Sequence, residues 1–290
     1  MRSSLFFLSL TAALVHCGRL SEEENLSLQS QCSHRLFRRI LNADPIPAHD
    51  VIGQSAVAIV IHGHNKGVCS GTLISSRHIL TASHCFRDNE CSSSNSTIRV
   101  HVGAQCIDEE SCRGTVVGVI NYISYPGYFP SECTGVSKVG LDITVVELEQ
   151  DVYNGVATVA CLPSIAEIPM EMTGYAFGDK NFVLGRIGMI KWKSVECPKN
   201  EDANVLCAQP NKFEQNGCFG DSGHGALQIG IGSRPVIHGI FSKGASCESV
   251  MNMIELKRKG MHIKPLESDE LFVSVYPFKS FICEASGVCG

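Results

Sequence analysis

The chain has 290 residues and a formal net charge of −5, so it is long enough for one large hydrophobic core or two smaller ones. This mild charge lacks the strong basic excess of proteins that bind nucleic acid or an anionic membrane surface, and we expect neither as a partner. After the N-terminal region, no segment is apolar over enough residues to span a bilayer.

The N-terminal region predicts export from the cell. Residues 1–18 contain a basic start, a short apolar run and then small residues, which is typical of a secretory signal peptide. A membrane anchor would need a longer apolar run. Residues 19–39 are polar and end in RLFRR. Asn25 and Asn95 begin glycosylation sequons, and Asn95 is the better candidate because its Ser/Asn-rich surroundings indicate an exposed loop. We therefore expect a secreted, extracellular glycoprotein.

The remaining chain contains many short runs rich in β-branched residues, separated by Gly, Pro, Ser and Asn. Such runs without long amphipathic helices predict an all-β sandwich or barrel, which periodicity alone does not distinguish. The expected strands lie within residues 57–63, 98–103, 115–125, 142–149, 185–192, 234–241 and 271–276.

The cysteine content also indicates a secreted protein. Of the fifteen cysteines, Cys17 lies in the signal region, and the fourteen that remain form an even set suited to disulfides. Zinc is the alternative use of cysteines, but the sequence contains no CxxC pair. We expect no metal and no cofactor.

Three segments carry the chemistry: LTASHC at 80–85, GLDIT at 140–144 and CFGDSGHG at 218–225. They place His84, Asp142 and Ser222 in that chain order. A serine hydroxyl becomes a nucleophile when a histidine takes its proton and a carboxylate orients the histidine. The order differs from those of α/β-hydrolases and subtilisins, and the GxSxG elbow of lipases and esterases is absent.

With CSGTLIS at 69–75 and GIFSKG at 239–244, these segments resemble the chymotrypsin-type (trypsin-like) serine endopeptidases from about Ile40 to Ile282. The acidic LSEEEN start and the Cys-rich tail further resemble the secreted trypsin-like set expanded in nematodes. The resemblance implies two antiparallel β-barrels, with the active site in the cleft between them and a short C-terminal helix within 273–283.

The same resemblance implies the division of the chain. Residues 19–39 would be a propeptide, 40–160 the N-terminal barrel, and 161–290 the C-terminal barrel with its helix and tail. Cleavage between Arg39 and Ile40 would free an ammonium group that pairs with Asp221. The alternative is that RLFRR is a plain basic surface segment.

The resemblance also assigns supporting roles. The backbone N–H groups of Gly220 and Ser222 would form the oxyanion hole, and Ser242 would support Asp142. The implied disulfides are Cys69–Cys85, Cys197–Cys207, Cys218–Cys247, and Cys32–Cys161, which would hold a cleaved propeptide. Six cysteines allow fifteen pairings and stay open: Cys91, Cys106, Cys112, Cys133, Cys283 and Cys289. Residues 107–111 lie near the family's calcium loop, but an ordinary solvated acidic loop is the favoured interpretation.

The sequence departs from the family at His224, where the family has glycine, and at Lys243, which replaces an aromatic residue. In the substrate pocket, Asn216 replaces the aspartate of trypsin. Gly217 and Gly244 are expected to leave the pocket open to a large side chain.

Glu270 has two possible orientations: on the pocket wall, where it would accept basic residues, or facing solvent. The sequence leaves two functions open. The first is an endopeptidase acting on proteins or peptides, activated by another protease and controlled by serpin-type or Kunitz-type inhibitors. The second is an inactive homologue that binds a partner through the same cleft.

Overall fold

The structure is a computed structural model that describes residues 18–33, 55–62, 67–86, 97–107, 114–128, 138–152, 157–178, 187–199, 201–212, 215–228, 234–261 and 270–290. Residues 1–17 of the expected signal segment 1–18, the Arg39–Ile40 junction and Asn95 lie outside these residues, as does most of the acidic segment 107–111. No helix among the described residues is both long enough and apolar enough to cross a membrane.

The first barrel closes in the order β1-β2-β3-β6-β5-β4, with every pair antiparallel. β1 is buried on both faces, because Val57, Ile59 and Ile61 lie in one core cluster while Ala56 and Ala58 lie in another. Because the barrel closes, each strand pairs on both sides. The strands are β1 (Ala56–His62), β2 (Gly67–Leu73), β3 (His78–Thr81), β4 (Thr97–Val102), β5 (Thr115–Ser124) and β6 (Thr144–Leu148).

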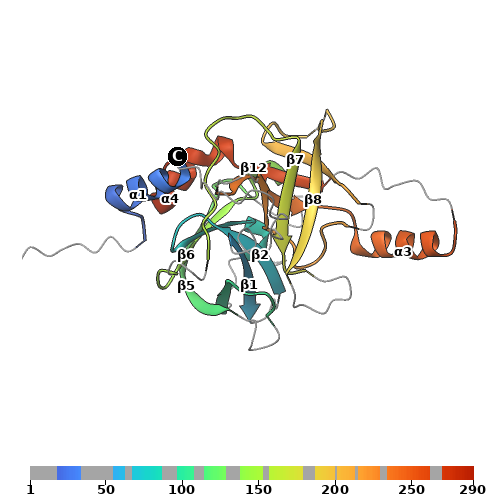
Figure 1. The fold of residues 1–290 in the computed structure, drawn as a ribbon, viewed down its shortest axis with the longest axis horizontal. Helices are drawn as coiled ribbons and strands as arrows, with labels where there is room; N and C mark the ends of the chain where they lie inside the picture. Colours follow the sequence, from blue (N-terminus) through green and yellow to red (C-terminus); the bar gives the residue numbers. More distant parts are fainter. Residues whose placement is uncertain are drawn as a thin grey trace, which may run out of the picture.

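The second barrel closes in the order β10-β11-β12-β9-β8-β7, again antiparallel, beside the first (Figure 1). Its interior is aromatic, with Trp192, Phe241 and Phe272 in one core cluster. The strands are β7 (Glu171–Ala176), β8 (Gly188–Val195), β9 (Val205–Pro210), β10 (Gly225–Gln228), β11 (Val236–Lys243) and β12 (Glu270–Ser274). The all-β, two-barrel prediction is confirmed.

Two helices depart from the sequence expectation. The C-terminal helix was expected within 273–283, but α4 spans Lys279–Ser286, because β12 pairs with β9 and β11 up to Ser274. In the insertion after Cys247, α3 (Cys247–Arg258) extends away from the barrels (Figure 1). Ser246 caps α3, since its side chain accepts a hydrogen bond from the Ser249 amide.

The N-terminal helix α1 (Glu22–Ser33) packs beside α4 (Figure 1). Leu28 is buried in the core, and Cys32 is bonded to Cys161. The Asn25 side chain accepts a hydrogen bond from the Cys289 amide at 3.0 Å, which ties this sequon to the C-terminal tail.

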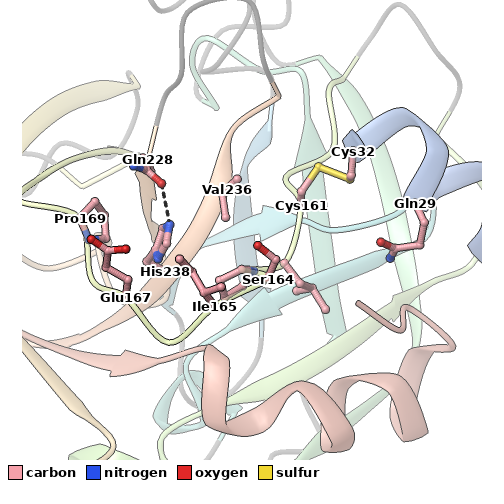
Figure 2. Close-up of a pocket in the computed structure, with 12 residues that line it drawn as sticks. Gln29, Cys32, Cys161, Ser164, Ile165, Glu167, Pro169, Gln228, Val236 and His238 are labelled. Carbon is pink, nitrogen blue, oxygen red and sulfur yellow. Dashed lines mark hydrogen bonds between the residues drawn. A yellow bond between two sulfur atoms is a disulfide. The ribbon is translucent and has the colours of Figure 1, made fainter. Parts of the chain in front are cut away.

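A cavity of about 520 Å³ lies beside the Cys32–Cys161 bridge (Figure 2). Gln228 and His238 reach it from β10 and β11, and their side chains are joined by a 3.1 Å hydrogen bond. Among the described residues, none lines both this cavity and the cleft that contains His84 and Ser222.

Candidate active site

Neighbouring strands bring His84 and Asp142 together. His84 lies in a 3-10 turn (Ser83–Phe86) that follows β3, and Asp142 precedes β6, the partner of β3. His84 Nδ1 lies 2.6 Å from Asp142 Oδ2, and the His84 amide donates to Asp142 Oδ1 at 2.9 Å. The carboxylate therefore fixes both the ring and the backbone of His84.

Asp142 is almost fully buried, and its charge is balanced by three donors. Burial raises the pKa of Asp142, but the His84 ring, the Ser242 hydroxyl and the His84 amide oppose this, and the pKa ends below its ordinary value. Ser242 Oγ donates to Asp142 Oδ2 at 2.6 Å. The carboxylate is thus ready to stabilise a protonated His84.

Ser222 lies on the loop before β10 and faces the same cleft as His84. This cleft has a volume of about 420 Å³ and is lined by residues of both barrels. Gly220 has a φ of 92°, a conformation that favours glycine. Cys218, Phe219, Gly220 and Ser222 of this loop line the cleft together with His84 and Cys85.

Ser70 holds this loop from the first barrel. Its hydroxyl donates to the Gly220 carbonyl at 2.8 Å and accepts from the Phe177 amide at 3.0 Å, while its amide donates to the Ser222 carbonyl at 2.7 Å. Sequence reasoning missed this residue. The available signal was a serine in CSGTLIS where the family's CGGSLI has glycine.

Asp221, the expected partner of a new N-terminus, is buried and already bound by backbone donors. Its Oδ1 accepts from the Gly178 amide at 2.9 Å and its Oδ2 from the Cys218 amide at 2.7 Å. Arg39 and Ile40 lie outside the described residues.

His224 is accommodated in the core of the second barrel. Its ring is fully buried and stacks between Trp192 and Phe241, with ring centroids 5.2 and 4.9 Å away. His224 Nδ1 donates to the Asp221 carbonyl at 2.6 Å, and burial lowers the pKa of His224 to about 4. Gly174 on β7 makes room, since a Cβ there would lie 2.7 Å from His224 Cδ2.

The ring of Phe241 lies close to both glycines that the sequence assigned to the substrate pocket. A Cβ built on Gly217 would overlap Phe241 Cζ, and one built on Gly244 would lie 3.0 Å from the same atom. Glu270 faces inward and is fully buried, where it accepts hydrogen bonds from Trp192 Nε1 and the Gly217 amide.

Lys243 and Asn216 were also assigned to the pocket, and of these two only Lys243 lines the cleft. Lys243 is exposed and lines the cleft. Asn216 is half-buried and is not among the described residues that line the cleft.

The disulfides brace this region. The structure joins the four pairs that the resemblance implied and adds Cys283–Cys289. Cys106 is also disulfide-bonded, and Cys91, Cys112 and Cys133 lie outside the described residues. Cys69 and Cys85 lie close to His84, but their sulfurs are joined and cannot act as thiolate ligands.

Comparison with known proteins places this geometry in a family. Residues 45–254, more than half of the chain, match the Trypsin family. The chain is similar to a trypsin-like protease, try-5, of Caenorhabditis elegans, with 27% identity over 236 residues that cover 64% of this chain and 70% of the relative.

Two mammalian proteins are similar at the same level. Chymotrypsin-C of Bos taurus is 28% identical over 144 residues, which cover 48% of this chain and 50% of that protein. The human atrial natriuretic peptide-converting enzyme is 27% identical over 197 residues, which cover 63% of this chain and 18% of that protein.

Proposed function

Because the chain belongs to the trypsin family of serine proteases, we propose that it is a secreted serine endopeptidase that cleaves peptide bonds through an acyl-enzyme on Ser222. The observation that carries this proposal is the 2.6 Å contact between His84 and a buried Asp142, in a cleft that Ser222 also lines. No part of this arrangement requires a cofactor.

The contact with Asp142 sets the role of His84. When His84 Nδ1 carries a hydrogen and donates it to Asp142, the other ring nitrogen, Nε2, is left to take the Ser222 proton. Ser222 Oγ then attacks the peptide carbonyl, and the protonated His84 gives its proton to the leaving amine. Water hydrolyses the resulting ester with His84 again acting as base.

The backbone N–H groups of Gly220 and Ser222 would stabilise the negative oxygen of the tetrahedral intermediate. The hydrogen bonds from Ser70 to the carbonyls of Gly220 and Ser222 support this role, because they fix the loop that carries both donors. A donor fixed before the reaction needs no reorganisation when the charge develops.

Activation would follow cleavage between Arg39 and Ile40. The new ammonium group would pair with Asp221, whose carboxylate accepts two backbone N–H groups in a buried position. An uncompensated buried charge is unfavourable, so a third partner would stabilise the loop. The precursor should be nearly inactive until it is cut after Arg39, and Arg39→Gln should keep it inactive towards peptide substrates.

Secretion is supported by the basic and apolar start of the chain and by its disulfides. The proposed partners are therefore extracellular: protein or peptide substrates, an activating protease, and inhibitors of the serpin or Kunitz type. Asn95 and Asn25 are the proposed glycosylation sites.

The second candidate is an inactive homologue that binds a partner through the same cleft. The specific observation that favours it is Phe241, which fills the space between Gly217 and Gly244 where a substrate side chain would bind. A fluorophosphonate probe separates the two candidates. The activated endopeptidase should be labelled at Ser222, and the Ser222→Ala variant should not be labelled. A correctly cut chain that resists labelling would leave only the binding function.

A further inference from the structure

We propose that Phe241 closes the substrate pocket, so that the residue preceding the cleaved bond must carry a small side chain such as that of Gly, Ala or Ser. The inference rests on the proposed endopeptidase function and specifies its substrate class. It makes Phe241 a specificity-determining residue.

The position of the reacting carbonyl defines where the adjoining side chain goes. With a carbonyl carbon near Ser222 Oγ and its oxygen at the N–H of Gly220, this side chain would lie in the hollow of the same cleft that the loop 217–220 lines. The opposite wall of the hollow is the segment 242–246, and both walls line the cleft. The Cys218–Cys247 bridge joins the walls, so they are fixed relative to each other.

The ring of Phe241 occupies the inner end of this hollow. A Cβ built on Gly244 would lie 3.0 Å from Phe241 Cζ, and one built on Gly217 would overlap the same ring atom. The tip of the ring therefore touches the backbone of both walls. Phe241 is 3% exposed and lines the cleft, so its ring is enclosed by the two walls and by the core behind it.

Buried rings of the described core pack directly against Phe241. Behind Phe241, the His224 ring stacks at 4.9 Å and the Phe272 ring packs edge-on at 5.4 Å, measured between centroids. Trp192 packs against His224 and Phe272, and all three of these side chains are fully buried. Cores at this packing density resist added volume, so a large substrate side chain would have to displace several rings.

Electrostatics also disfavour a basic side chain. Both carboxylate oxygens of Glu270 accept hydrogen bonds from the protein, and Glu270 does not line the cleft. The exposed Lys243 lines the cleft beside the hollow, and its ammonium would repel an approaching Lys or Arg. A buried cation would thus lose its hydration without gaining a counter-charge.

The first test uses the secreted chain after cleavage at Arg39. Tetrapeptide anilides identical except at the residue before the anilide would carry Gly, Ala, Ser, Leu, Phe or Arg there. We expect kcat/KM for the Ala substrate to exceed that for Phe and for Arg by roughly 100-fold or more, because the large groups cannot enter. Comparable values for Ala and Phe, or a preference for Arg, would overturn the inference.

The second test removes the ring. Phe241→Val and Phe241→Ala should each raise kcat/KM for the Leu and Phe substrates by at least about 10-fold relative to the Ala substrate. Tyr276→Ala is the matched control: it removes an aromatic side chain that is 38% exposed and does not line the cleft, and it should leave the ranking unchanged. An unchanged ranking in a folded Phe241→Val protein would contradict the proposed role of Phe241.

Fluorophosphonate labelling shows whether a negative result contradicts the endopeptidase function or only the role of Phe241. If the cut protein is labelled at Ser222 but cleaves large residues as readily as small ones, the endopeptidase function stands and the role of Phe241 is wrong. If the cut protein is not labelled, the proposed function fails and the inference fails with it. Should both Phe241 variants misfold, the wild-type substrate panel still decides the size limit.

Discussion

His224 should make the second barrel lose stability as the pH falls, and His224→Phe should remove this loss. The phenylalanine ring keeps an aromatic group between Trp192 and Phe241 but cannot be protonated. In the wild type, burial lowers the pKa of His224 to about 4, whereas an unfolded histidine titrates near 6.5. Between these two pKa values, His224 is therefore protonated in the unfolded chain and neutral in the folded chain.

The sign and size of the effect follow from this difference in pKa. Stability from a neutral buried His224 is complete above about pH 6.5 and is lost as the pH falls towards about 4. At about 1.4 kcal/mol per pKa unit, the wild type should lose about 3 kcal/mol relative to His224→Phe over this range. Burial also lowers the pKa of His78 to about 4 and raises that of Glu270 to about 7, but both groups are present in both proteins.

Urea denaturation between pH 7 and pH 4, followed by tryptophan fluorescence, measures the effect. Trp192 is the single tryptophan of the chain and stacks on His224, so its emission reports on this cluster. Phe272→Leu is the control, because it loosens the same cluster without changing a titrating group. Its pH profile should run parallel to that of the wild type. If the profile of His224→Phe also runs parallel, His224 is not held neutral by burial.

Other predictions concern the proposed catalytic site. Ser222→Ala and His84→Ala should each abolish most peptide turnover, and the double variant should lose little more, because the two side chains act as a unit. Ser70→Ala should lower kcat by about 10-fold with little change in KM, since the Gly220 carbonyl loses its donor. Glu270→Gln should lower the free energy of unfolding by about 1–3 kcal/mol, because its amide NH₂ would face a donor, and should leave the substrate ranking unchanged. The intact mass of the mature protein should show seven disulfides and no alkylated cysteine.

Local motifs made the fold and the contact between His84 and Asp142 predictable. Asp142 precedes the β-branched run of β6, His84 follows β3, and these two strands are neighbours in the barrel. These segments therefore contain both the reactive side chains and the strands that bring His84 and Asp142 together. The Cys69–Cys85 pair was expected from the family resemblance, and the structure contains this disulfide.

The proposed shape of the substrate pocket was not predictable in the same way, because the position of Phe241 depends on non-local packing. Gly217 and Gly244 indicate an open pocket only when the neighbouring strand leaves the space between them empty. Phe241 fills that space, and His224 and Phe272 behind it come from different segments. A local sequence pattern does not predict the orientation of the Phe241 ring, because that orientation depends on how Phe241, His224 and Phe272 pack in one core. The inward position of Glu270 has the same origin.

Because of the bridge between Cys32 and Cys161, release of α1 depends on two separate chemical events: cleavage of the chain and reduction of the disulfide. In the uncut chain the bridge closes a loop across a sequence separation of 129. A loop of this length lowers the entropy of the unfolded state and thereby raises the free energy of unfolding by about 5 kcal/mol. A cut after Arg39 falls inside this loop and turns the bridge into a tether between two polypeptides. The tether keeps α1 at a high local concentration near the contacts that join Leu20 to Ser286 and Asn25 to Cys289. After cleavage alone, α1 stays attached through the Cys32–Cys161 disulfide. After reduction alone, it stays attached through the peptide chain. Release of α1 therefore requires both cleavage and reduction.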